Sequence, residues 1–189
     1  MSSGKLIIFS APSGCGKSTI LNRVLKLNSD LHFSVSATSR PPRPGEKDGE
    51  NYYFITPEQF KEKIANGEFL EYEELFQNKF YGTLKSEVEK CLDRGENIVL
   101  DVDVNGAVNI KRLYGDSALA LFILPPSLEV LRERLVKRGT ETLEVIDERV
   151  SRAEYELSRA PEFDRTIMND DLDTAVNEAN EIVMEFVNS

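Results

Sequence analysis

Hydrophobic and polar positions divide the chain into short apolar runs and longer stretches with helical periodicity. The first apolar run, Lys5 to Ser10, is continuous, which is typical of a strand buried on both faces of a parallel sheet, and Lys17 to Leu27 has the period of a helix. The alternation resumes later, with strands predicted at 97–102, 118–124 and 166–168. A helix that ends at Tyr114 is predicted after the first of these strands, and one from Ser127 to Gly139 after the second. Further helices cover much of the charged stretch 140–160 and span 172–187. Strands that alternate with helices form parallel sheets with right-handed crossovers, so the pattern predicts an α/β fold.

The stretch from about residue 34 to residue 90 interrupts this rhythm. A strand at 32–36 leads into a loop rich in proline and glycine, and two further short strands are predicted at 52–55 and 69–76. The helix between them begins with a capping box formed by Thr56 and Gln59, with Pro57 at its first position, and another helix, 84–94, stops at Gly95. These short elements predict a small mixed α/β subdomain inserted into the parallel sheet.

Length and composition fit one soluble domain. A chain of 189 residues can bury the core of one α/β domain but not of two, and its apolar fraction of 40% and charged fraction of 30% are typical of globular proteins. The longest apolar run has the length of a strand and the N-terminus lacks the pattern of a leader, so we expect no membrane association and a cytoplasmic location. Two distant cysteines imply no disulfide scaffold, and a formal charge of −10 argues against nucleic-acid binding.

A glycine-rich loop follows the first strand, and its sequence is Ala11-Pro12-Ser13-Gly14-Cys15-Gly16-Lys17-Ser18-Thr19. Gly14 and Gly16 can adopt backbone angles closed to other residues, so successive N–H groups can turn toward a phosphate at the N-terminus of a helix. Lys17 can then reach the β- and γ-phosphates of a nucleotide, and the Ser18 hydroxyl can hold Mg²⁺. Ala11 replaces the first glycine of the usual P-loop pattern, at a position that needs a small residue more than unusual angles. The loop therefore predicts nucleotide binding.

Several motifs, spread over nearly the whole chain, resemble those of guanylate kinases. In chain order they are Ser36 to Glu46, Gly49 to Phe54, Phe69 to Tyr72, Tyr81 to Thr83, Ile98 to Gly106, Arg134 to Thr142 and Asn169 to Leu172. Their number and their order make the resemblance specific. It implies that the γ-phosphoryl group of MgATP is transferred to GMP, with dGMP as a further acceptor, and that no protein partner is obligatory.

The same resemblance implies the domain organisation. The fold would be a P-loop NTPase-type parallel sheet flanked by helices, in a single domain over residues 1–189. Its core would comprise 1–33, 91–133 and 164–189, with an inserted GMP-binding subdomain at about 34–90 and a helical lid at about 134–163. The subdomain and the lid should both move toward the phosphate loop when nucleotides bind, because water must be excluded from the phosphoryl group.

Individual roles are also implied by the resemblance. The GMP phosphate would be held by Arg40, Arg43, Tyr52 and Tyr81. Guanine would be recognised by Glu71 together with Ser36, Thr83 and Asp101. The transferring phosphoryl group would be covered by Arg134, Arg138 and Arg149, acting with Lys17 and Arg43. The adenine of ATP would lie near Asn169 and Asp170.

The chemistry of these residue types agrees with the implied roles. Arg40 and Arg43 lie three residues apart in a proline-stiffened loop, and the planar fork of arginine suits bidentate contact with phosphate. Guanine donates from N1 and N2 whereas adenine has an acceptor at N1, so a carboxylate such as Glu71 favours guanine. The attacking phosphate oxygen is already an anion, so no general base is needed, and we expect His32 to be structural or exposed.

Three features of the sequence each allow two interpretations. Asp101 and Asp103 are predicted to face the same side at the carboxyl end of a strand, one recognising guanine and the other positioning the water ligands of Mg²⁺, in either order. Arg134 and Arg138, at i and i+4, either approach the phosphates together or form a solvated basic face. Cys15 either is reactive, because a helix N-terminus and a lysine favour its thiolate, or fills a position that needs a small residue.

Two other functions fit parts of the pattern. The first is a binding module for a phosphopeptide or protein partner, built on the same fold without catalysis, although intact Gly16-Lys17-Ser18 and lid arginines argue against it. The second is a kinase of the same class whose acceptor is AMP, UMP or dTMP. Consumption of ATP in the presence of GMP tests the first, and a panel of acceptors tests the second.

Overall fold

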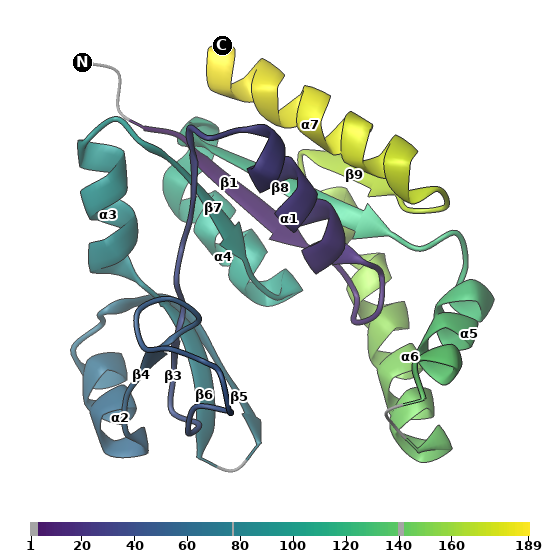
Figure 1. Cartoon of the computed structure of the whole chain (residues 1–189), viewed down its shortest axis with the longest axis horizontal. Coiled ribbons are helices and arrows are strands. Elements are labelled where there is room, and N and C mark those ends of the chain that lie inside the picture. The colour runs from purple at the N-terminus through teal and green to yellow at the C-terminus, as the bar shows by residue number, and fades with distance from the viewer. Residues whose placement is uncertain (1–3, 77, 140–141) are drawn as a thin grey trace.

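A parallel sheet of five strands forms the centre of the computed structural model, which describes residues 4–76, 78–139 and 142–189 (Figure 1). The spatial order is β2-β7-β1-β8-β9. The strands are β1 (Leu6–Ser10), β2 (Leu31–Phe33), β7 (Asn97–Asp101), β8 (Ala118–Leu124) and β9 (Arg165–Met168). Each neighbouring pair is parallel, so the predicted α/β fold with a parallel sheet is confirmed.

Helices cover both faces of this sheet. On one face lie α1 (Lys17–Leu27) and α7 (Leu172–Asn188), and on the other lie α3 (Lys85–Asp93) and α4 (Val104–Tyr114). Strand β1 shows why the run is continuously apolar: Ile7 and Phe9 pack on the side of α1 and α7, whereas Leu6 and Ile8 pack on the side of α3 and α4. All four side chains are fully buried.

A second, smaller sheet projects from one end of the parallel sheet (Figure 1). Its order is β4-β3-β6-β5, from β3 (Ala37–Thr38), β4 (Tyr53–Phe54), β5 (Phe69–Phe76) and β6 (Lys79–Leu84). Helix α2 (Pro57–Ala65) covers it through Phe60, whose ring stacks 4.3 Å from that of Phe69 and 5.2 Å from that of Phe80. The predicted capping box of Thr56 and Gln59 is present at the start of α2.

Two strands of the small sheet, β3 and β6, escaped prediction. Strand β3 has only two residues, and Gly82 breaks the apolar pattern of β6. A Cβ atom at Gly82 would lie 2.8 Å from the backbone oxygen of Glu71, so glycine is required where β5 approaches closely. The residue that weakens the strand signal is therefore the residue that permits the strand pairing.

The predicted lid, at about 134–163, includes the second half of α5 (Leu128–Arg138) and all of α6 (Leu143–Ser158), and these two helices lie across from the small sheet (Figure 1). Gly139 ends α5 in the left-handed conformation, as expected. Thr140 and Glu141, which belong to the lid motif, lie outside the described residues. Two short 3-10 helices, Gly115–Ser117 and Ala160–Glu162, complete the elements.

Some boundaries differ from the predicted ones. Strand β2 ends at Phe33 rather than at residue 36, and α3 begins at Lys85. Val88 of α3 is buried in the main core against β1, β7 and α4. The division into core, subdomain and lid remains a prediction.

Candidate active site

The glycine-rich loop between β1 and α1 has the predicted backbone geometry. Gly14 has φ 90° and Gly16 has φ 83°. Among the described residues Asn78 is the one non-glycine with positive φ, so Ala11 has ordinary angles and only its small size matters. A Cβ atom at Gly16 would lie 2.5 Å from the Asn169 amide nitrogen, which itself donates to the backbone oxygen of Cys15 at 2.7 Å. The loop is therefore held from outside by the segment after β9.

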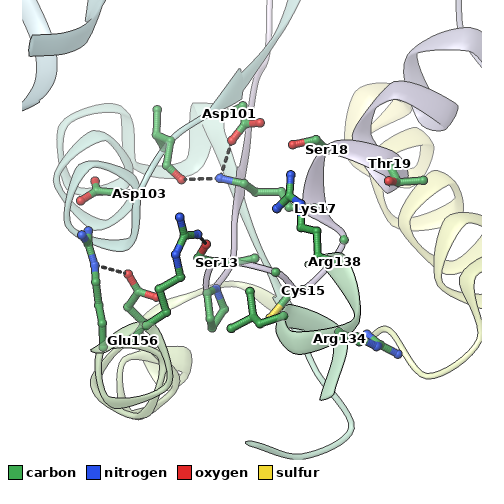
Figure 2. Close-up of a pocket in the computed structure, with 18 of the residues that line it drawn as sticks. Ser13, Cys15, Lys17, Ser18, Thr19, Asp101, Asp103, Arg134, Arg138 and Glu156 are labelled. Carbon is green, nitrogen blue, oxygen red and sulfur yellow. Dashed lines mark hydrogen bonds and ion pairs between the residues drawn. The ribbon is translucent and has the colours of Figure 1, made fainter. Parts of the chain in front are cut away.

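Lys17 is oriented by the carboxyl end of β7. Its ammonium group forms an ion pair with Asp101 and donates to the backbone oxygen of Val102 at 3.2 Å (Figure 2). Lys17 is also the first residue of α1, so it lies beside the backbone N–H groups at the helix N-terminus. This places a positive charge where a phosphate would meet those groups.

A cavity of about 980 Å³ opens beside the loop. Besides loop residues 11–19, it is lined by five charged residues that the sequence singled out: Asp101, Asp103, Arg134, Arg138 and Arg149. The structure therefore brings together the loop, the carboxyl end of β7 and the lid arginines.

The lid arginines point in different directions. Arg138 extends from α5 toward Lys17, whereas the guanidinium of Arg134 turns away from the loop and donates to the backbone oxygen of Asn169 at 2.9 Å (Figure 2). Arg149 reaches across from α6 and donates to the Ser13 hydroxyl at 2.5 Å. Arg134 and Arg138 do not converge, although their i, i+4 spacing places them on one face, because long side chains can leave one helix face in different directions.

The position of Asp103 shows that one prediction is wrong, namely that Asp101 and Asp103 face the same side of one strand. Strand β7 ends at Asp101, and Asp103 is the N-cap of α4, where its Oδ1 atom accepts from the backbone N–H of Gly106 at 2.7 Å. The two carboxylates therefore do not lie on one strand with a common side. Both nevertheless line the main cavity and a second one next to it.

The second cavity, of about 370 Å³, lies between the small sheet and the end of β7. The predicted acceptor residues among its lining are Ser36, Tyr52, Glu71, Tyr81, Asp101 and Asp103. Phe33, Asn51 and Glu73 also line it and were not predicted. Asn51 lay inside a quoted motif, whereas nothing in the local pattern marked Phe33 or Glu73.

Glu71 is held in a defined position by the strand beside it. Thr83, buried on β6, donates from its hydroxyl to Glu71 Oε1 at 2.6 Å. The pKa of Glu71 is raised to about 7, mainly by desolvation and also by the negative charge of Asp103, while the hydrogen bond from Thr83 opposes the rise. Thr83 does not line the cavity, so in this structure it binds the Glu71 carboxylate and does not face the space that the carboxylate borders.

Arg40 is clamped by a residue that received no role in the sequence analysis. Its side chain is 9% exposed, and its guanidinium makes two hydrogen bonds of 2.6 Å to Glu46 and lies 5.0 Å from the centre of the Tyr52 ring. The hydrogen bonds from Arg40, together with one from the backbone N–H of Arg43, lower the pKa of Glu46 to about 2. Arg43 itself is exposed, and neither arginine lines the 370 Å³ cavity.

Cys15 occupies a core position. It is 1% exposed, and desolvation raises the pKa of its thiol to about 12, although the positive charge of Arg134 opposes the rise. The expectation of a reactive thiolate is therefore wrong, because burial outweighs the helix N-terminus and Lys17. The small-residue interpretation is the correct one.

The residues expected near adenine are not at either cavity. Asn169 is buried and binds the loop through its side chain, and Asp170 is exposed. Neither of them lines the two cavities described above. Their contact with a nucleotide remains a prediction.

Neither a membrane-crossing helix nor a ready-made metal cluster is found in the described part of the chain. No helix in the described part of the chain has both the length and the apolar character needed to cross a membrane. Over the same residues, no group of three or more histidine, cysteine, aspartate or glutamate side chains could hold a metal ion.

Comparison with known proteins gives one consistent result. The family model of guanylate kinase matches residues 3–186. A guanylate kinase of Bacteroides thetaiotaomicron is 58% identical over 98% of this chain and 91% of its own length, and one of Porphyromonas gingivalis is 54% identical over 97% and 98%. The crystal structure of guanylate kinase from Anaplasma phagocytophilum superposes with a TM-score of 0.78, at 30% identity, over 100% of this chain and 89% of that one. The chain belongs to the guanylate kinase family.

Proposed function

We propose that the two adjoining cavities are the nucleotide sites of a guanylate kinase reaction, in which the γ-phosphoryl group of ATP passes to GMP and gives ADP and GDP. ATP would occupy the 980 Å³ cavity and GMP the 370 Å³ cavity. The observation that carries this proposal is their shared wall, which includes Glu73, Asp101, Val102 and Asp103. Two of these residues, Asp101 and Val102, bind the ammonium group of Lys17. A phosphate in each cavity would therefore meet its partner next to the P-loop lysine.

The donor side fits a nucleotide triphosphate with Mg²⁺. The loop amides and Lys17 would hold the β- and γ-phosphates, and the Ser18 hydroxyl would be a ligand of the ion. Asp103 would act through water, since its Oδ1 atom accepts from Gly106 while its Oδ2 atom makes no hydrogen bond or ion pair with the described residues. Hydroxyl and carboxylate oxygens suit Mg²⁺, which keeps several waters and binds substrate phosphates, and when bound it would neutralise charge on the transferring group.

The acceptor side fits a purine monophosphate. Glu71 would accept from guanine N1–H and N2–H, with Ser36 and Asp101 beside it in the same cavity. The phosphate would be held by Tyr52 and Tyr81 together with Arg40 and Arg43. Arg40 makes two bonds to Glu46 and one to the backbone oxygen of Pro41, which leave other N–H donors of its guanidinium for a phosphate.

During transfer, the residues need only align the phosphates and stabilise the developing charge. Arg138 and Arg149 approach the loop from two different helices, and Arg134 would join them from its position at Asn169. No general base is required because the acceptor oxygen is already an anion. We place the enzyme in the cytoplasm, with small-molecule substrates and neither a nucleic-acid nor an obligatory protein partner.

The experiment is an acceptor panel of GMP, dGMP, AMP, UMP and dTMP with MgATP, run on the wild type, Glu71→Gln and Arg43→Ala. Glu71→Gln should lose about 2–4 kcal/mol in kcat/KM for GMP, because the amide places a donor opposite a donor, and should discriminate less against AMP. Arg43→Ala should weaken all monophosphates alike, since phosphate carries no base identity.

Two outcomes would contradict the proposal. Equal loss of GMP and AMP use in Glu71→Gln would remove Glu71 as the group that recognises the base. Absence of ATP consumption with any acceptor would favour the binding module that retains the fold without catalysis.

A further inference from the structure

Helix α6 carries a second arginine that points into the main cavity, one turn after Arg149. Arg152 lines the cavity together with Arg149 but has different partners. Its Nη2 atom donates to Glu73 Oε1 at 2.8 Å, and its Nε atom donates to Glu156 Oε1 at 2.9 Å. Glu73 belongs to β5 of the small sheet, so this side chain joins the lid to the sheet across the cavity.

Glu73 is well placed within the proposed acceptor site. It lies two residues after Glu71 on β5, and alternate residues of a strand share a face, so both carboxylates line the 370 Å³ cavity. In the pairing of β5 with β6, Glu71 stands opposite Thr83 and Glu73 stands opposite Tyr81. Glu73 therefore lies beside Tyr81, on the proposed phosphate side of Glu71.

Glu156 fixes the guanidinium from the other side. This carboxylate is 7% exposed, its Oε1 atom accepts from Arg152, and its Oε2 atom is buried without a hydrogen-bond partner among the described residues. Because the guanidinium group is planar and rigid, a hydrogen bond at Nε also fixes the direction of the Nη2 atom. Arg152 is thus oriented toward Glu73 by its own helix.

We propose that Arg152 is a positioning residue that couples the acceptor sheet to the lid, so that Glu73 holds α6 where Arg149 reaches the phosphate loop. This inference rests on the proposed function and deepens it by adding two residues that carry no role in the resemblance. The Arg152 and Glu73 side chains are 48% and 32% exposed, so solvent screens their attraction and the pair can break and reform as nucleotides enter and leave. Arg152 acts through Glu73 and Arg149 and does not itself bind phosphate.

The kinetic test is a double-mutant cycle with Glu73→Ala and Arg152→Gln. Glutamine at position 152 retains a donor for the buried Glu156, so this variant keeps the fold. Each single variant should lower kcat about tenfold with KM for GMP and ATP changed less than about twofold, and the double variant should be no slower than either single one. If the losses multiply instead, Arg152 contacts the substrates directly and the proposal is overturned.

The matched control breaks another ion pair of the lid. Arg132 of α5 donates to Asp147 of α6 at 2.7 Å, its side chain is 45% exposed, and it lines neither cavity. Arg132→Gln should leave kcat within about twofold of the wild type. An equal loss in this control would show that any lid pair has the same effect, which would also overturn the proposal.

Hydrogen exchange separates this inference from the proposed function. In the wild type with no nucleotide, amides of α6 (residues 143–158) should exchange more slowly than in Glu73→Ala, while amides of α7 exchange equally in both. Unchanged exchange of α6, in an enzyme that phosphorylates GMP, would overturn the coupling alone. If α6 exchanges faster in Glu73→Ala than in the wild type, but the wild type phosphorylates no acceptor, the proposed function is overturned and the contact is established.

Discussion

Lowering the pH from 8 to 6 should weaken the use of GMP about tenfold through the protonation of Glu71. The pKa of this carboxyl is raised to about 7 by burial. The ionised fraction then falls from about nine-tenths at pH 8 to about one-tenth at pH 6. Only the carboxylate accepts from both guanine N1–H and N2–H, so kcat/KM for GMP should follow the ionised fraction.

The assay must separate Glu71 from the substrate, because a phosphate monoester also titrates, near pH 6. Kcat/KM for GMP reports the ionisations of free enzyme and free substrate, so it is measured from pH 5.5 to 8.5 in the wild type and in Glu71→Gln. The substrate contributes equally to both. The ratio of wild type to variant should therefore rise about tenfold from pH 6 to pH 8, and a ratio that stays constant would refute the reasoning.

Stability gives an independent check of the same carboxyl. Its folded pKa lies above the ordinary value of 4.5, so between about pH 4.5 and pH 7 the folded state binds more protons than the unfolded state. The contribution of Glu71 to the free energy of unfolding is present below pH 4.5 and is lost as the pH rises through 7. Acid thus favours folding at this residue while it opposes GMP binding, so weaker GMP use at pH 6 cannot be attributed to unfolding through Glu71.

Two further predictions concern the phosphate loop. Lys17→Met should fold normally and lower kcat, raising the activation free energy by about 3–4 kcal/mol or more, because the positive charge beside the transferring group is lost. Near-normal turnover in steady-state assays would contradict the assignment. Cys15 should be alkylated more slowly than Cys91 in mass-spectrometric assays, because it is fully buried whereas Cys91 is only partly so; equal rates would show that the loop opens readily.

The chain's local patterns were enough to predict most of the fold. Continuous apolar runs identified β1, β7 and β8, and helix signals such as the Thr56–Gln59 capping box and Gly139 placed the ends of α2 and α5 within a residue or two. Local signals failed where a short strand is stabilised by its neighbours alone. Strand β3 pairs with β4 and β6 over two residues, too few for any periodicity.

The candidate site was predictable to the extent that its residues lie within contiguous motifs. The P-loop, Glu71 and Tyr81 all fall in such segments and do gather at the two cavities. The orientations of other site residues could not be predicted. Arg134 binds a backbone carbonyl 35 residues away, and Asp103 caps a helix. Sequence spacing places a side chain on a face, but tertiary partners decide where it points.

The partners of the cations illustrate what sequence reasoning misses most readily. Lys17 is paired with Asp101 and Arg40 with Glu46, so these two cations, both proposed to bind phosphate, already have a carboxylate beside them. A guanidinium as buried as that of Arg40 would be costly without a charged partner, and Glu46 also fixes its plane. An arginine held in one orientation loses less conformational freedom when a phosphate binds to its remaining donors. In the proposed site Glu46 would therefore support GMP binding while contributing negative charge, so a formal charge of −10 is compatible with a site for anions.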